Sequence, residues 1–271
     1  MTLMSKNFEQ IDSKLINNKQ INTISDYLEY IRIIRVMLGG VKLWYRGVSN
    51  IKYELTPSIY RPGFWPYSES TANDMFNDFI RRAKGLNSKY TEFKKWEWYQ
   101  VQQHYGLPTR LLDWTEGSLI GLYFAVRNIR VDNSPAVWVI DPFKLNEISM
   151  GKRVLLFSDK LIQDINDKIV DDYIPGGEKL GKLPIAILPT YVDNRINSQK
   201  STFTIHGSEK EGFEKVYIES SKEYLCVQLK INTTSAEVIK DELIRAGISE
   251  VTLFPDLEGL ARELKYYHRM K

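Results

Sequence analysis

The chain has 271 residues, of which 43% are hydrophobic and 26% charged, and its formal net charge is +3 at pH 7. These values are typical of a globular protein, and so small a charge argues against a dedicated DNA-binding protein but not against a local basic patch. A single cysteine, Cys226, excludes a disulfide within the chain, and the three histidines lack metal-ligand spacing. No stretch approaches the ~20 apolar residues of a membrane span, so we expect a cytoplasmic protein that binds no metal and no membrane.

The spacing of apolar residues predicts the elements of the first half of the chain. Residues 1–24 are a polar N-terminal segment, and a helix follows over 24–38. Residues 90–105 form another helix, closed by Gly106. The other elements expected here are a strand over 41–47, a structured loop over 58–68, a helix over 70–85, a short strand or turn over 109–115, a buried helix over 116–129 and an apolar strand over 135–142.

The sequence of the second half of the chain predicts several strands and, toward its end, two helices. A capping box of Thr234 and Glu237 opens a helix over 234–248, and the last helix starts at Asp256. Strands are expected over 153–158, 183–192, 201–207, 223–231 and 251–255, with a charged excursion over 160–183. Strands and helices without regular βαβ alternation indicate an α+β fold, in a single domain over residues 25–271.

The stretch WYQVQQHYGLPTRLLDWTEGSLIGLYFAV, residues 98–126, combines many polar side chains with aromatic residues. A segment needed only for packing would use Leu and Val at such positions. We interpret it as one wall of a ligand pocket, with Arg46 from the first strand opposite. Gly47, next to that arginine, suggests a close backbone approach to a ligand.

Three motifs carry a resemblance to a known family. The sequences LWYRG (43–47), QHYGLPTRLLDWTEGSLIGLYFAV (103–126) and TLFPDLEGLA (252–261) resemble the FRG domain, named for its (Phe/Tyr)-Arg-Gly signature. The resemblance covers roughly residues 25–265. It implies a protein of bacteria or phages, plausibly a toxin or a component of phage defence.

The order of elements also resembles the split-sheet fold of ADP-ribosyltransferases, which implies a mixed, mostly antiparallel sheet with flanking helices. That resemblance implies NAD as the substrate. Arg46 would hold its phosphates, a Thr-bearing strand before a helix ending in LYFA would brace the nicotinamide, and Gln199 would stand where a late catalytic glutamate is expected. A glutamine cannot act as a base, so Asp113 is the alternative carboxylate near the reacting carbon.

These considerations give two sets of candidate site residues. The candidate catalytic residues are Arg46, His104, Asp113 and Gln199. The candidate substrate-binding residues are Tyr45, Gly47, Gln103, Tyr105, Thr109, Arg110 and Thr115.

Some of these residues have an equally good structural explanation. Arg110 and Asp113 lie three apart on a short strand and should point to opposite faces, so one of them is expected to be structural, with Asp113 a possible cap for the helix beginning near Thr115. His206 and Gln199 should also lie on different faces of a late strand.

Three functions stay open from the sequence. The first is an ADP-ribosyltransferase or NAD glycohydrolase, with a nucleotide ligand and a protein or nucleic acid as acceptor. The second is a nucleic-acid-binding protein or metal-independent nuclease, with His104 as general acid–base, Arg46 and Arg110 on the phosphate and the basic stretch 81–96 as its electrostatic footprint. The third is a non-catalytic nucleotide-sensing or protein-interaction module. The sequence does not predict an oligomeric state.

Overall fold

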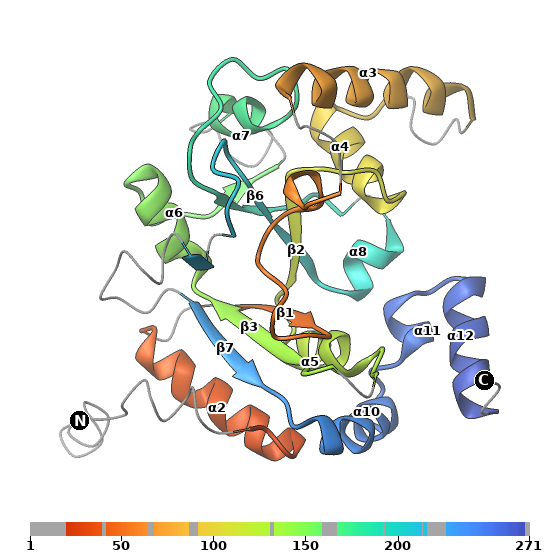
Figure 1. Cartoon of the computed structure of the whole chain (residues 1–271). Helices are drawn as coiled ribbons and strands as arrows, with labels where there is room; N and C mark the ends of the chain where they lie inside the picture. The colour runs from red at the N-terminus through yellow and green to blue at the C-terminus, as the bar shows by residue number, and fades with distance from the viewer. Residues whose placement is uncertain are drawn as a thin grey trace. The chain divides into compact units, whose positions relative to one another are not determined.

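The computed structural model describes residues 20–39, 42–63, 68–86, 92–130, 133–158, 167–191, 193–212, 214–215 and 226–268. The chain divides into two compact units, each built from separate segments (Figure 1). Unit 1 comprises Met1–Tyr53, Gly117–Ile140 and Cys226–Lys271, and unit 2 comprises Glu54–Glu116 and Asp141–Leu225. Most of the polar segment expected over 1–24 lies outside the described residues. The single domain expected over 25–271 stays a prediction.

Unit 1 contains three antiparallel strands with β3 (Ala136–Ile140) between β1 (Trp44–Val48) and β7 (Cys226–Lys230). Every residue of β3 is buried, as its apolar sequence predicts. Val139 lies opposite Tyr45 on one side and Val227 on the other, which fixes the register of the strands. Apolar side chains from all three strands contribute to one core.

Helices enclose this core. The amphipathic helix α2 begins at a capping box of Thr23 and Asp26 and buries Tyr27, Ile31 and Ile34. The α-helices that the structure describes in unit 1 are α2 (Ile24–Met37), α5 (Ser118–Val126), α10 (Ala236–Arg245), α11 (Glu250–Leu253) and α12 (Leu257–Tyr267).

Helix α5 lies against β1 at a distance that only glycine permits. A Cβ atom on Gly47 would lie 2.2 Å from the carbonyl oxygen of Gly121 and 2.3 Å from the amide nitrogen of Ala125. A Cβ atom on Gly121 would lie 2.7 Å from the Cβ of Tyr45. Helix α5 therefore approaches the sheet closely at Gly121, and packing explains why residue 47 is glycine.

The C-terminal part of unit 1 corrects two expectations. The strand expected over 251–255 is wrong, because Ser249 and Thr252 form a capping box that starts helix α11. The capping box of Thr234 and Glu237 is also wrong. A 3₁₀ turn, η3 (Thr233–Ser235), precedes α10 instead. Asn232 is the N-cap of this turn, and its side chain accepts a hydrogen bond from the Thr234 amide. The expected start of the last helix at Asp256 is confirmed, because its carboxylate accepts a hydrogen bond from the Gly259 amide.

Unit 2 contains four strands in the order β4 (Leu156–Phe157), β5 (Ile185–Leu188), β6 (Ser201–Ile205) and β2 (Leu111–Thr115). The β5–β6 and β6–β2 pairs are antiparallel, and β4–β5 is parallel. Among the strand pairs described within the two units, only β4–β5 is parallel. The expected α+β class with a mixed, mostly antiparallel sheet and flanking helices is confirmed.

An aromatic core holds the helices of unit 2 together. Phe76 from α3 meets the ring of Tyr99 from α4 edge to face, with centroids 5.6 Å apart, and Phe203 from β6 belongs to the same core. Among the described residues, the helices of this unit include η1 (Ser58–Tyr60), α3 (Glu69–Leu86), α4 (Lys95–His104), α6 (Pro142–Met150), α7 (Asp167–Tyr173) and α8 (Asn194–Ser198).

The packing of α5 on β1 generates a stability prediction. We expect Gly47→Ala to lower the free energy of unfolding by about 2 kcal/mol or more, because the added methyl group meets backbone atoms that cannot move aside. Gly85→Ala is the control, because a Cβ at Gly85 in α3 has no neighbour within 4 Å. Urea unfolding of both variants measures the difference. Equal stabilities of wild type and Gly47→Ala would show that packing does not explain this glycine.

A partly buried carboxylate in unit 1 generates a pH prediction. Glu250 accepts hydrogen bonds from Tyr123, Arg127 and Arg262. Burial alone would raise the pKa of Glu250, but the hydrogen bonds from Arg127 and Arg262 outweigh it and hold this pKa below its usual range. Because the pKa of Glu250 is lower in the folded state than in the unfolded state, its ionised carboxylate stabilises the fold at pH values above the unfolded pKa, about 4.3. This contribution disappears as pH falls through the folded pKa.

Glu250→Gln should therefore lower the free energy of unfolding at pH 7 by about 1–3 kcal/mol. The difference from wild type should shrink below about pH 4. Urea unfolding at a series of pH values measures it, and a difference that stays constant down to pH 3 would contradict the assignment.

Candidate functional site

Residues 98–115 of the polar stretch form most of α4, the loop that follows it and strand β2, all within unit 2, whereas α5 at the end of the stretch belongs to unit 1. Helix α4 ends at His104, and Gly106 turns the chain with a positive φ of 81°. Strand β2 then runs from Leu111 to Thr115. The motif thus gathers polar side chains where a helix ends and a strand begins.

Gln103 links three parts of this motif. Its amide nitrogen donates a 2.9 Å hydrogen bond to Oδ1 of Asp113, and its amide oxygen accepts one from the hydroxyl of Thr109. Thr109 is fully buried and its hydroxyl also accepts a hydrogen bond from the Leu111 amide. Asp113 is the only exposed residue of β2. A solvent-facing carboxylate is therefore held in place by a buried hydroxyl through one glutamine.

His104 faces a carboxylate that the sequence analysis did not single out. Its Nδ1 lies 3.6 Å from Oδ2 of Asp193, and both side chains are partly exposed. The other oxygen of Asp193 caps α8 by accepting a 2.8 Å hydrogen bond from the Ile196 amide. The carboxylate is thus fixed by the helix it caps, and it can orient the imidazole and stabilise its protonated form. An Asp before Asn194–Ser198 is a helix-start signal that the expected late strand obscured.

We refer to Gln103, His104, Thr109, Asp113 and Asp193 as the polar cluster. Tyr105 lies beside it, with its ring 5.2 Å from that of His104 at 75° and 58% of the residue exposed. An exposed aromatic face next to charged and amide groups is suited to a ligand with a planar ring and several hydroxyl groups.

Gln199 does not lie on a strand, so its expected alternation with His206 along one strand is wrong. Residue 199 is the C-cap of α8, and β6 begins only at Ser201. The hydroxyl of Thr115 donates a 2.6 Å hydrogen bond to the carbonyl oxygen of Gln199. Thr115 therefore ties the end of β2 to the turn between α8 and β6, and contact of the Gln199 side chain with a ligand stays a prediction.

Arg110 is directed into the interior of unit 2. It is 1% exposed, its Nη1 forms a 2.8 Å ion pair with Glu69, and its Nη2 donates to the carbonyl oxygen of Tyr173. Its amide nitrogen donates to the hydroxyl of Tyr99, whose pKa burial raises to about 12. The guanidinium thus holds α3 and α7 to the start of β2, which is a structural role. A substrate contact by Arg110 stays a prediction.

The remaining candidates lie on β1 in unit 1. Tyr45 and Gly47 share the face that α5 covers, and burial raises the pKa of Tyr45 to about 12. Arg46, between them, is directed to the other face of β1, opposite Trp138 in the strand register. The expected ligand contacts of these three residues stay predictions. Asp113 does not cap a helix, because α5 begins after Gly117 without a side-chain cap.

Glu214 is a second carboxylate whose position the sequence left undefined. It is 9% exposed, and its two oxygens accept hydrogen bonds of 3.1 and 3.0 Å from the Leu55 amide. Burial raises its pKa, although these hydrogen bonds counteract the shift. Because both oxygens bind the main chain, Glu214 fixes the loop before η1.

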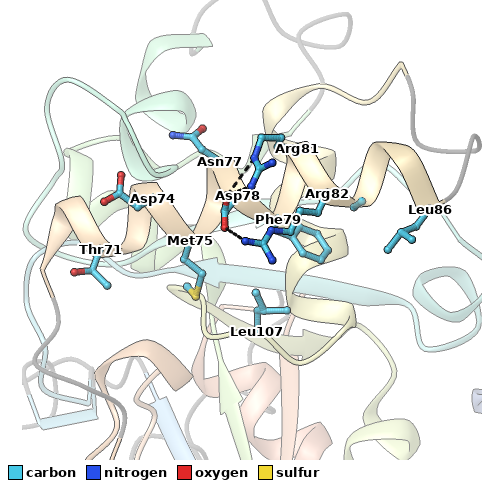
Figure 2. Close-up of a pocket in the computed structure, with 11 residues that line it drawn as sticks. Thr71, Asp74, Met75, Asn77, Asp78, Phe79, Arg81, Arg82, Leu86 and Leu107 are labelled. Carbon is cyan, nitrogen blue, oxygen red and sulfur yellow. Dashed lines mark hydrogen bonds and ion pairs between the residues drawn. The ribbon is translucent and has the colours of Figure 1, made fainter.

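A groove of about 770 Å³ runs along α3 (Figure 2). Asp78 lies in it and forms ion pairs of 2.7 and 2.8 Å with Arg81 and Arg82, which neutralise part of the basic stretch 81–96. None of the candidate residues lines this groove. Its walls are Thr71, Asp74, Met75, Asn77, Asp78, Phe79, Arg81, Arg82, Ala83, Leu86 and Leu107.

Within the described ranges, no group of three or more His, Cys, Asp or Glu residues could hold a metal ion. Among the helices that the structure describes, none has the length and apolar character needed to cross a membrane.

The motifs around Arg46 and His104 lie within a stretch that matches a known family. Residues 41–134 match the family described as the FRG domain, so the chain carries an FRG domain over this stretch. The match includes the first part of the polar cluster, up to Asp113, but not Asp193 or Gln199. No curated protein and no solved structure matched the chain. The resemblance to ADP-ribosyltransferases stays a prediction.

The structural role of buried Arg110 and the exposed position of Asp113 predict different effects of substitution on the free energy of unfolding. Arg110→Met leaves the buried carbonyl of Tyr173 without its donor, so we expect the free energy of unfolding to fall by about 1–3 kcal/mol. Asp113→Asn keeps an acceptor for Gln103 at an exposed position, so we expect a change within about 0.5 kcal/mol. Urea unfolding compares the two, and a strongly destabilised Asp113→Asn would make that residue structural.

Proposed function

We propose that the polar cluster of unit 2 binds NAD or a related nucleotide and cleaves its nicotinamide–ribose bond. The protein would then be an ADP-ribosyltransferase or an NAD glycohydrolase. The presence of the FRG domain and the chemistry of the cluster support this proposal. The toxin or phage-defence setting follows from the family resemblance alone and is part of the proposal.

The observation that carries the proposal is the exposed carboxylate of Asp113 held by Gln103. Cleavage of the nicotinamide–ribose bond develops positive charge on the sugar, and a carboxylate fixed near the anomeric carbon stabilises that charge. The amide of Gln103 can share the ribose hydroxyls with the same carboxylate. The exposed ring of Tyr105 can stack on the nicotinamide.

His104 and Asp193 supply the acid–base part of the proposal. In hydrolysis, the C–N bond breaks and its electron pair leaves with the nicotinamide nitrogen, while the oxygen of water bonds to the anomeric carbon. Neutral His104 takes the proton from that water, and Asp193 stabilises the resulting imidazolium. In transfer, a nucleophile on a protein or nucleic acid replaces the water.

Two further roles come from the resemblance to ADP-ribosyltransferases. Arg46 would hold the phosphates of NAD, because a guanidinium pairs bidentately with phosphate oxygens. Gln199 would position a sugar hydroxyl rather than act as a base. The chemistry proposed for the polar cluster does not depend on either role.

The test is nicotinamide release from NAD by the purified full-length chain, with a cell lysate as the source of acceptors. We expect release by the wild type and a fall of about 10²-fold or more in both Asp113→Asn and His104→Gln. Asp74→Asn, an exposed carboxylate on α3 outside the cluster, is the matched control. Arg46→Ala tests the phosphate role separately.

Absence of both nicotinamide release and an NAD-induced rise in melting temperature, from well-folded protein, would overturn the proposal. A thermal shift without release would point to the non-catalytic nucleotide-sensing module. Release that is unchanged in Asp113→Asn and His104→Gln would place the chemistry elsewhere in the chain.

The His104–Asp193 pair favours one alternative function. An imidazole oriented by a carboxylate can also act as general acid–base in phosphodiester cleavage without a metal. The alternative predicts RNA or DNA cleavage in the presence of a chelator, abolished in His104→Gln and retained in Asp113→Asn. Cleavage with that pattern and no NAD turnover would identify a nuclease.

A further inference from the structure

Helix α12 presents its apolar side to solvent. Leu257, Leu260, Leu264 and Tyr267 are 84%, 41%, 47% and 58% exposed, and Gly259 is the only buried residue of the helix. A surface helix of a globular protein normally buries its apolar side and exposes its charged side. Helix α12 has the reverse orientation, which indicates a surface used for binding.

The opposite side of α12 is held to α11 by polar contacts. Arg262 donates a 2.8 Å hydrogen bond to Glu250, and its guanidinium lies 4.9 Å from the ring centroid of Phe254. Glu263 accepts hydrogen bonds from the Ser249 hydroxyl and the Val251 amide. These contacts and the N-cap at the start of the helix fix its orientation. The apolar side is therefore presented on a rigid element.

The exposed apolar residues have the spacing of a helix–helix seam. Leu257, Leu260, Leu264 and Tyr267 follow one another at intervals of 3, 4 and 3 residues, as the a and d positions of a heptad do. Ala261, also exposed, lies at an e position beside the seam. Such a seam packs against a helix with the same pattern, and this chain itself carries one.

We propose that α12 pairs with α12 of a second copy of the chain, antiparallel, across a two-fold axis near its centre. In that arrangement Leu260 packs against Leu264 of the second copy, and Leu257 packs against Tyr267. The contact is self-complementary and closes as a dimer, because each helix presents the same residues to the other.

The charges along α12 specify the antiparallel direction. Glu258 lies in the first turn and Lys265 in the last turn, both exposed and on the same flank of the seam. Antiparallel pairing places Glu258 of each copy near Lys265 of the other, so the two-fold axis produces two attractive pairs. The two helix dipoles then run in opposite directions, which is also favourable. Parallel pairing would place these flanks of the two copies on opposite sides of the seam, so the attraction would be lost.

A membrane surface is a poorer occupant of this seam. Helices that bind membrane surfaces carry an excess of Lys and Arg on the polar side. In α12 Arg262 and Lys265 are balanced by Glu258 and Glu263. A seam of only 11 residues also limits the buried area, so the dimer should be weak and depend on protein concentration.

The first test is the oligomeric state of the full-length chain by sedimentation velocity over about 10–500 µM, the range expected for a small interface. We expect a reversible monomer–dimer equilibrium for the wild type. Leu260→Glu with Leu264→Glu should weaken it at least about 100-fold, because it places four carboxylates in the seam. Val238→Glu on α10, also an exposed apolar residue at 59%, is the matched control and should leave it unchanged.

The second test exchanges the charges beside the seam. Glu258→Lys alone and Lys265→Glu alone should each weaken the dimer roughly three- to tenfold, and the double exchange should restore it. The double exchange restores attraction only in the antiparallel arrangement. Circular dichroism verifies that all variants keep the helical content of the wild type.

Each of the other results overturns the proposal. A chain that stays monomeric throughout the concentration range would leave the seam to a different partner. Association that persists in Leu260→Glu with Leu264→Glu would use another surface. Loss of association in both single exchanges without recovery in the double exchange would exclude antiparallel pairing.

Discussion

The pairing of β2 with β6 is the constraint on which the candidate site depends. The antiparallel register sets Asp113 opposite Phe203 and Thr115 opposite Ser201, so the residues just before β6 are brought to the end of β2. The hydrogen bond from Thr115 to the carbonyl of Gln199 secures that junction. A shift of one residue would turn Asp113 to the other face of the strand, away from Gln103.

The polar cluster combines rigidity with exposure. Thr109 is fully buried, whereas Asp113 is exposed. Gln103 forms a hydrogen bond with each of them, so the exposed carboxylate is anchored to the buried hydroxyl. Asp193 joins His104 to a capped helix in the same way. Polar groups that face solvent lose orientation unless such second contacts hold them, so this arrangement would reduce the reorganisation required by the ligand binding proposed above.

The sequence predicted what local patterns determine. The apolar run of β3, the start of α12 at Asp256 and the polar character of 98–126 could all be recognised from neighbouring residues. The position of Asp193 beside His104 could not be predicted, because the two residues are remote in the sequence and the residues around Gln199 have the pattern of a strand rather than of helix α8.

Tertiary contacts decide two further positions. Residues 251–255 have a composition that favours a strand, but the capping box at Ser249 and the arginines around Glu250 stabilise a helical turn. Arg110 and Asp113 could be assigned to opposite faces by alternation, yet only the positions of Glu69 and Tyr173 reveal which of them is structural.

The interleaved composition of the two units has a consequence for synthesis. Unit 2 is inserted between the segments of unit 1, and β3 receives its second neighbour only when β7 has been made. During translation, unit 2 can complete its strand pairs first, whereas unit 1 needs the C-terminal segment from Cys226 onward. Contacts between segments so remote in sequence form slowly. Unit 1 therefore completes its fold only after the segment from Cys226 onward has left the ribosome, and any activity that requires both units is withheld until then.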